Sequence, residues 1–293
     1  RWRNGKIHKI DLGPKSPKEP FTDLLEDRKK RLWMVTDNSG IFCLETNQLT
    51  AYSMKEGLPS NYLRRIIEDS AGEIWAGDWE GGIVRFRDQR WESMRPSSGH
   101  SDAVRSMVAT NGALWIGTSA GGLLRLKQGL TARITMDEGL PDACIQQLLL
   151  DGRGALWGGT PHKLFRLSLA QLNDVADGKE PQIDAITYGR SDGLPDVSFA
   201  NWCDPRCVRA SNGELWFATA NGAIHFQPSE LKESKPPQVL IEQTLLGGKP
   251  VTAKALQQLR PDTGRLEFRF TAPCLTAPDR VRFRYQLTGV DSD

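Results

Sequence analysis

The sequence predicts an all-β fold: a partial β-propeller of four-stranded blades, with at least five blades plus a half-blade, followed by an incomplete β-sandwich. Three observations support this prediction. An apolar-Trp pair recurs about every forty residues, two apolar runs joined by a small-residue turn follow each Trp, and a Gly-Leu-Pro marker lies between units. The 293 residues exceed what one core usually holds, but propellers run long as single units.

The Trp repeat sets the period of the blades. Its five copies, spaced by 42, 40, 42 and 59 residues, are Leu32-Trp33, Ile74-Trp75, Leu114-Trp115, Leu156-Trp157 and Leu215-Trp216. An Asp lies six residues before the Trp in three copies (Asp27, Asp69 and Asp151), while Ala109 and Ala210 hold that place in two others. An Asp in phase with a turn Gly is typical of turn capping. We therefore expect the Trp side chains in the core and the Asp side chains in structural roles.

The runs after each Trp predict the hairpin formed by the second and third strands. Residues 82–86 and 122–126 are nearly identical in pattern, with apolar residues at consecutive positions. Such runs indicate strands that are buried on both faces, as in stacked blades. Arg85, Arg125 and Arg166 occupy equivalent third-strand positions, and we expect them to make hydrogen bonds between blades.

Two segments depart from the regular period. The interval from Trp157 to Trp216 is longer by about 17 residues, and the polar surplus at 170–186 predicts an inserted loop on the fourth blade. Residues 1–10 align with the third and fourth strands of a unit, which predicts the outer pair of a further blade whose first half precedes residue 1. The propeller is therefore expected to be incomplete in this chain.

The chain divides into two predicted domains. The propeller is expected over residues 1–231 and a Lys- and Pro-containing linker over 232–237. Residues 238–293 are expected to begin an immunoglobulin-like β-sandwich. Residues 266–270 and 281–287 alternate apolar and polar side chains, as strands with one buried face do.

Composition excludes several classes of function. Lys plus Arg is 38 against 36 for Asp plus Glu, so no strong field would recruit nucleic acid. No apolar segment is long enough to cross a bilayer, and we expect no membrane contact by this chain itself. The four His lack zinc-ligand spacing, and no nucleophile motif or phosphate loop stands out, so neither metal nor cofactor is expected. Cys203 and Cys207 would form a disulfide or stay free thiols.

The predicted ligand site lies on the face that carries the turns between second and third strands and the crossings between blades. Loops there can vary without disturbing the stacked sheets, and a site for one ligand must break the repeat. The candidate ligand-binding residues are Asp78, Trp79, Glu80, His162, Trp202 and Asn221, with Arg64, His100 and Asp142 at the crossings. Trp79 and Trp202 stand out because neither follows the phase of the repeated Trp.

These motifs resemble a known family. The segment 69–77 followed by 82–86, with Gly57-Leu58-Pro59 between units, resembles the two-component regulator propeller repeat over residues 1 to about 230. Residues 237–293, including 247–251 and 283–291, resemble the start of a triple-tyrosine immunoglobulin-like domain. The resemblance implies the periplasmic or extracellular ligand-sensing region of a bacterial transmembrane signalling protein. Its kinase or diguanylate cyclase output would lie outside this chain.

The resemblance also implies a small-molecule or oligosaccharide ligand and a homodimer formed through the parent protein. Two other classes of function stay open: a propeller lyase or hydrolase with a site on the same face, and a protein-binding scaffold. An enzyme would need polar residues that break the repeat and converge on the central channel. The residues of that kind are few and separated in the sequence, so we expect a sensor and not an enzyme.

Overall fold

The structure is a computed structural model of residues 1–293. It describes all residues except 1, 4, 9, 11, 14–15, 95–101, 111, 190–191, 193, 195–197, 200–205, 232–236, 253–255, 257–263, 275–280, 282, 284 and 287–293. The chain forms two compact units, Arg1–Glu230 and Leu231–Asp293, and each is described here by itself. Within the described residues no helix has the length and apolar character needed to cross a membrane.

The first unit contains four antiparallel four-stranded sheets, one for each of the first four Trp repeats, which confirms the predicted propeller blades. The strands are β3 Phe21–Glu26, β4 Leu32–Thr36, β5 Ile41–Glu45 and β6 Gln48–Tyr52; β7 Leu63–Glu68, β8 Ile74–Asp78, β9 Ile83–Arg87 and β10 Arg90–Met94; β11 Val104–Thr110, β12 Ala113–Thr118, β13 Leu123–Lys127 and β14 Leu130–Ile134; β15 Gln147–Leu150, β16 Ala155–Gly159, β17 Leu164–Ser168 and β18 Ile186–Tyr188. We number these sheets blades 1 to 4.

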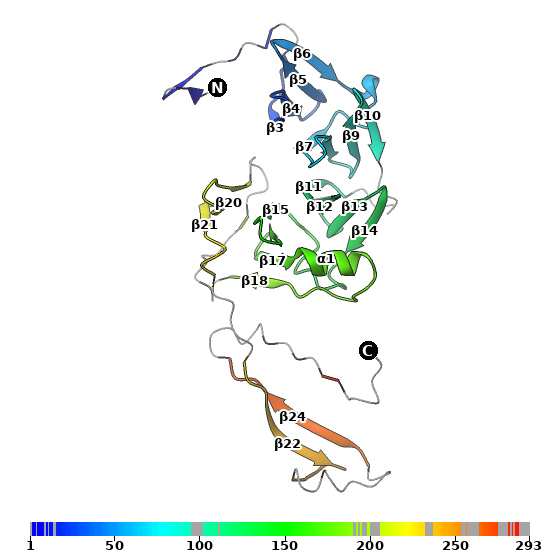
Figure 1. Cartoon of the computed structure of the whole chain (residues 1–293), viewed down its shortest axis with the longest axis vertical. Coiled ribbons are helices and arrows are strands. Elements are labelled where there is room, and N and C mark those ends of the chain that lie inside the picture. The colour runs from blue at the N-terminus through cyan, green and yellow to red at the C-terminus, as the bar shows by residue number, and fades with distance from the viewer. Residues whose placement is uncertain are drawn as a thin grey trace. The chain divides into compact units, whose positions relative to one another are not determined.

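Blade 5 differs from the prediction because its described residues form three strands: β19 Cys207–Arg209, β20 Leu215–Thr219 and β21 Gly222–Phe226. A two-stranded ribbon of β1 Trp2–Arg3 and β2 Lys6–Ile7 stands at the place predicted for the outer pair of a further blade. The five sheets follow one another along an arc (Figure 1), and the first strand of each lies beside the first strand of the next: β3, β7, β11, β15 and β19.

The core lies between neighbouring blades. Every residue of β8 and β16 is buried, as strands packed on both faces require. Between blades 1 and 2 the fully buried Trp33 ring meets Phe86 at 5.0 Å and Trp91 at 5.9 Å, both edge-on. Each such aromatic ring buries about 150–250 Å², so these rings contribute much of the apolar contact between the two blades. Hydrogen bonds such as that from the Thr22 hydroxyl to the Leu63 carbonyl add to it.

A carboxylate beneath the Trp explains the Asp-to-Trp spacing. Asp69 Oδ1 accepts the backbone N–H of Ala71 and Glu73, while Oδ2 accepts Trp75 Nε1 at 2.8 Å. Asp27 and Asp151 make the same bond to the indoles of their own blades. Burial raises the pKa of Asp27, but the hydrogen bonds from Trp33 and Arg31 outweigh it and hold the pKa below its usual value. The structural role predicted for the three Asp is confirmed.

Blades 3 and 5 lack this carboxylate for two different reasons. Ala210 replaces the Asp in blade 5, and Trp216 Nε1 donates to Glu214 instead. In blade 3 the turn is one residue shorter, because Ala109 pairs with Leu114 whereas the corresponding pair in blade 2 is Glu68 with Ile74. The prediction that Ala109 holds the place of the turn Asp is therefore wrong by one residue. Thr110 is the first residue of the turn and corresponds to Asp69. Trp115 Nε1 is buried with no hydrogen-bond partner among the described residues.

The exposure of Trp216 corrects the prediction that all five Trp are core residues. Trp33, Trp75, Trp115 and Trp157 are buried, whereas Trp216 is 36% exposed. The other four indoles point toward the next blade, as Trp157 does against Phe226 at 4.9 Å. No further sheet of the first unit covers Trp216 among the described residues, and its ring stacks on His225 at 4.3 Å instead.

The surplus in blade 4 is a helix and not the predicted loop. Helix α1 spans Leu169–Ala176 and buries Leu172 and Val175 against the core. Ser168 caps its N-terminus, and Arg125 of blade 3 donates to the carbonyls of Asn173 and Ala176 at its C-terminus. A cation is stabilising at that end of a helix.

The predicted hydrogen bonds between blades are thus present for Arg125. Arg85 instead pairs within its own blade, with Glu73 and Glu92.

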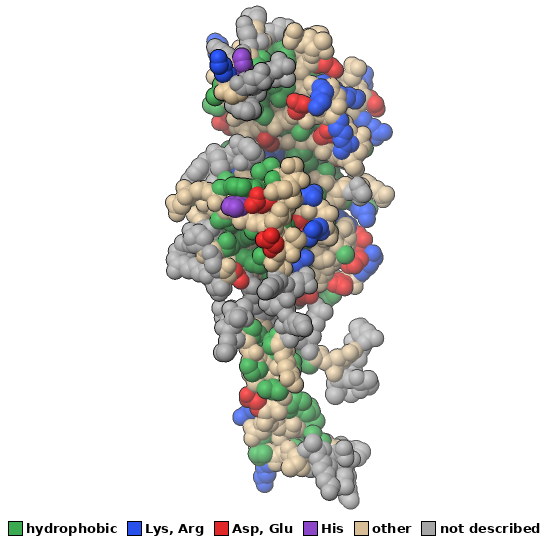
Figure 2. All heavy atoms as spheres, turned by 60° about the vertical axis from the view of Figure 1, so that its left-hand side comes forward, with side chains coloured by type: hydrophobic (Ala, Val, Ile, Leu, Met, Phe, Trp, Pro, Cys, Tyr) green, Lys and Arg blue, Asp and Glu red, His purple; other side chains and the backbone are tan. Residues whose placement is uncertain are grey.

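The second unit contains one three-stranded sheet in its described residues: β22 Leu240–Leu246, β23 Lys249–Pro250 and β24 Leu266–Thr271. The described residues between 281 and 287 are not in a strand, although the Phe283 ring packs on Phe270 at 4.8 Å. Hydrophobic side chains are visible on the surface of this unit (Figure 2). Ile241 and Phe268 are among the exposed apolar residues of the sheet. The immunoglobulin-like assignment and the boundaries proposed for the two domains stay predictions.

Candidate functional site

The turns between second and third strands share one frame. Three residues after the repeated Trp, blades 1, 3, 4 and 5 carry a Thr whose hydroxyl donates across the turn to a backbone carbonyl: Thr36, Thr118, Thr160 and Thr219. In blades 1 and 3 a Gly with positive φ then meets the end of the fourth strand. A Cβ added to Gly40 would overlap the Tyr52 carbonyl oxygen. The side chains of the two residues after the Thr take no part in these hydrogen bonds and differ from blade to blade.

Asp78 belongs to the frame and not to the variable part. It holds the Thr position in blade 2, where its buried carboxylate accepts the backbone N–H of Glu80 at 2.8 Å and of Gly82 at 2.6 Å. Asp78 therefore builds the turn that presents Trp79. The sequence predicted Asp78 as a ligand-binding residue because it differs from the residues of the other blades. The structure shows that Asp78 replaces the Thr of those blades and closes the turn in its place.

Trp79 occupies the first variable position of that turn and is 40% exposed. Two guanidinium groups lie over its ring: Arg64 Cζ is 3.7 Å from the ring centroid and Arg105 Cζ is 5.5 Å from it. Contacts of this kind contribute about 0.5–2 kcal/mol each, more as the cation is desolvated. The indole therefore holds two cations in place at the junction of blades 2 and 3.

β-Bulges orient both arginines. In blade 2, Leu63 pairs with Asp78 and Arg65 pairs with Gly77, so the register shifts at Arg64. In blade 3, the register shifts in the same way around Arg105. A bulge bends the strand and re-aims the extra side chain. Thr22 is the bulge residue of blade 1, so the bulge repeats while its side chain changes from blade to blade.

Gln146 holds the corresponding position in blade 4. Its backbone N–H donates to the Gly159 carbonyl, and Gly159 also pairs with Gln147. Gln146 is only 6% exposed, and its Oε1 has no hydrogen-bond partner among the described residues. The same holds for Arg105 Nε. Buried polar atoms normally find a partner, but Arg85 Nε and Arg125 Nε share this property although their guanidinium groups form structural ion pairs. The property alone therefore does not mark a ligand-binding group.

The next residue along each first strand forms a buried polar ring that is structural. Arg65 Nε donates to the Arg105 carbonyl at 2.6 Å and Gln147 Nε2 donates to the Ala218 carbonyl at 3.0 Å. Cys144 lies beside this ring. Burial raises the pKa of its thiol, and the positive charges of Arg105 and Arg206 partly oppose that rise.

Glu80, His162 and Asn221 lie in their expected turns. Glu80 is the exposed second variable residue beside Trp79, while His162 and Asn221 are exposed in the turns of blades 4 and 5. Trp202 and His100 fall outside the described residues. Sequence reasoning missed Arg105 and Gln146, because a bulge is not visible in a repeat of side-chain types.

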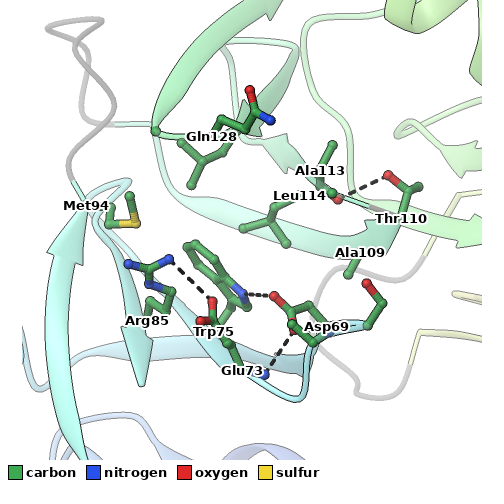
Figure 3. A pocket seen from close by; sticks show the side chains of 15 residues that line it. Asp69, Glu73, Trp75, Arg85, Met94, Ala109, Thr110, Ala113, Leu114 and Gln128 are labelled. Atoms are coloured by element: carbon green, nitrogen blue, oxygen red, sulfur yellow. Dashed lines mark hydrogen bonds and ion pairs between the residues drawn. The ribbon is translucent and has the colours of Figure 1, made fainter. Parts of the chain in front are cut away.

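A cavity of about 450 Å³ lies at the opposite end of blades 2 and 3 (Figure 3). It opens beside the shortened turn of blade 3 and is lined by Trp75, Leu114 and the turn of Asp69. Its main polar groups pair with one another, Asp69 with Trp75 and Arg85 with Glu73. Since the short turn accounts for the opening, we interpret the cavity as a packing gap. No cluster of three or more metal-ligating side chains occurs in the described part of the chain.

Comparison with protein-family profiles and with curated proteins gives no match. Solved structures are similar. One is the extracellular domain of a proposed hybrid two-component system of B. thetaiotaomicron, with 19% identity over 94% of this chain and 38% of that chain and a TM-score of 0.64. A second such extracellular domain from the same organism has 15% identity over 85% and 34% of the two chains and a TM-score of 0.53. The chain thus spans little more than a third of these two relatives.

Virginiamycin B lyase from Staphylococcus aureus is similar too, with 16% identity over 82% of this chain and 80% of the lyase and a TM-score of 0.55. At such identities the similarities establish the all-β propeller fold alone. Sensor domains and an enzyme share that fold, so function has to be argued from the site.

Proposed function

We propose that this chain is an extracytoplasmic ligand-sensing region of a bacterial signalling protein and that it binds a small molecule or oligosaccharide around Trp79. The observation that carries the proposal is the exposed Trp79, fixed in a built turn with Arg64 and Arg105 against its ring. An exposed aromatic ring with oriented polar groups is characteristic of recognition sites. The extracellular domains of similar fold support a sensing role, and the relay to a cytoplasmic output belongs to the proposal.

The charged side chains of the propeller unit do not favour a nucleic-acid partner. Figure 2 shows basic and acidic side chains interspersed over the face of the propeller unit that it displays. A mixed surface of this kind provides no long-range field of one sign. Recognition is therefore expected to depend on the local groups at the junction of blades 2 and 3.

The test is calorimetric titration of the full chain with xylo-oligosaccharides, galacto-oligosaccharides and oligogalacturonate. We expect at least one to bind, and Trp79→Ala to weaken it about tenfold or more. Trp216→Ala, which also removes a partly exposed Trp, should leave the affinity unchanged. Equal loss in both variants, or none in either, contradicts a site at Trp79.

The same incubations address the enzyme alternative. A lyase or hydrolase of this fold would convert the bound saccharide, and mass spectrometry of the mixture would then show shortened or unsaturated products. We expect the saccharide to be recovered intact. Product formation that is lost in Trp79→Ala would replace the sensor proposal with a catalytic one.

A further inference from the structure

Arg64 and Arg105 lie at the β-bulges of blades 2 and 3, and Gln146 holds the corresponding place directly before β15 of blade 4. The first strands β7, β11 and β15 lie side by side. The next residue in each strand is consumed by contacts between blades, as Arg65 and Gln147 are. Arg64 and Gln146 are themselves 7% and 6% exposed, so they line the inner side of the site, while Trp79 is its exposed part.

The chemistry of Arg64 and Arg105 is cationic. Arg64 covers a face of the Trp79 indole at stacking distance, so a sugar ring cannot stack on that face. The ring acts instead as a support that keeps two planar guanidinium groups oriented. Oriented guanidinium groups match the geometry of carboxylate and sulfate oxygens, which they bind through paired hydrogen bonds.

The acidic side chains around the site have other partners or lie at its edge. The carboxylate of Asp78 closes the turn, Asp102 pairs with Arg133 at 3.2 Å, and Asp23 lies 3.9 Å from Arg65. Glu80 is exposed on the turn, and Asp142 accepts the backbone N–H of Cys144. None of these contacts engages Arg105, whose guanidinium group lies 5.5 Å from the centroid of the Trp79 ring.

We propose that the site reads a carboxylate or sulfate group of an acidic oligosaccharide through Arg64 and Arg105, with the Gln146 amide as an additional polar contact. This inference rests on the proposed function and narrows its ligand class. Arg105 is the sharpest position to test, because it contacts the indole from the neighbouring blade. Its removal leaves the Asp78 turn and the Arg64 stack in place.

The experiment titrates the full chain with three probes: oligogalacturonate as the carboxylate, a chondroitin sulfate oligosaccharide as the sulfate, and a neutral xylo-oligosaccharide. We expect an acidic probe to bind and the neutral one not to bind. The stronger of the two acidic probes identifies the anion. Added NaCl should weaken the binding, because it screens the attraction between the charges.

The variants are Arg105→Gln, Arg105→Lys and, as a matched control on an exposed outer strand of the same unit, Arg90→Gln. Arg105→Gln should weaken the acidic probe about tenfold or more, since a hydrogen bond to a charged group is lost. Arg105→Lys should recover part of that loss because it keeps the charge, and Arg90→Gln should change nothing. An unaltered melting temperature in each variant shows that the fold is intact.

The outcomes separate this inference from the proposed function. Binding of the neutral probe that is as tight as that of the acidic probes, and that is lost in Trp79→Ala, overturns the anion inference and keeps the ligand site. Acidic binding that survives both Arg105→Gln and Trp79→Ala removes the site altogether. Failure of both acidic probes to bind also overturns the inference.

Discussion

The two ends of each blade are built on different rules. At the end that joins first and second strands, blades 1, 2 and 4 repeat one device, a turn carboxylate bonded to the indole of the same blade. At the end that joins second and third strands, a hydroxyl or the Asp78 carboxylate fixes the frame, and two residues are left to vary. The first end stabilises the stack of blades. The second holds variable side chains at little cost to stability, which is what a binding face requires.

The largest expected effect tests the repeating end through its Trp. Trp157→Ala removes a fully buried ring that contacts Phe226 and should lower the free energy of unfolding by about 3–5 kcal/mol. Trp216→Ala, at the same phase but partly exposed in blade 5, should cost about 1 kcal/mol. Urea denaturation monitored by circular dichroism measures both. Equal losses of unfolding free energy would mean that the position of the Trp in the repeat, and not its burial, determines how much it stabilises the fold.

A smaller effect should follow from removing the carboxylate alone. Asp151→Ala leaves the buried Trp157 indole and two backbone N–H groups without their acceptor, which costs about 1–3 kcal/mol. Asp37→Ala, at a variable position of the opposite end, should stay within about 0.5 kcal/mol. If Asp37→Ala were as costly as Asp151→Ala in the same denaturation series, the distinction between the two ends would fail.

Blade 3 offers the reverse experiment. Replacing residues 110–113 by the five-residue turn of 69–73 restores the length and the carboxylate of blade 2 and gives Trp115 Nε1 an acceptor. We expect a gain of about 1 kcal/mol in unfolding free energy. The same graft with Ala in place of its Asp is the control and should give no gain. If the graft with Asp and the graft with Ala stabilised the protein equally, the gain would come from the length of the turn and not from the hydrogen bond to Trp115 Nε1.

The smallest effect is a pH dependence. The folded pKa of Asp27 lies below its usual value of 3.8, because the Trp33 and Arg31 hydrogen bonds outweigh the opposing effect of burial. The stabilisation from Asp27 is therefore complete above about pH 4. It decreases as the pH falls from there through the folded pKa. Unfolding measured between pH 2 and 6 should show less acid destabilisation in Asp27→Asn than in the unmodified chain, and identical profiles would exclude Asp27 as a source.

The sequence was sufficient for the blades because each one repeats the same side-chain pattern around its Trp. The Trp phase placed β4, β8, β12, β16 and β20 correctly, and the turn Asp were assigned their role. The surplus in blade 4 was taken for a loop because it carries several polar residues. Its Leu172 and Val175 nevertheless share the buried face of α1.

The candidate site was predicted less well than the fold. Trp79 was identified because it does not follow the repeat. Asp78 does not follow it either, but only because it replaces the Thr that closes the turn in other blades. Arg105 and Gln146 gave no signal at all, because a bulge is a feature of backbone register. The side chain that a first strand directs toward the Trp79 turn depends on where its register shifts, and the order of residue types does not reveal that position.

The bulges also bear on how such a chain could acquire new ligands. A bulge residue contributes no pair to the ladder, so exchanging it leaves the sheet bonding untouched. Thr22, Arg64 and Arg105 already show that one backbone site accepts a short hydroxyl or a long cation. The exchange still changes the contacts between blades, because the Thr22 hydroxyl donates to the Leu63 carbonyl and Arg64 is buried. The first strands of blades 1, 2 and 3 each offer one position where a contact can change without altering the pairing of that strand.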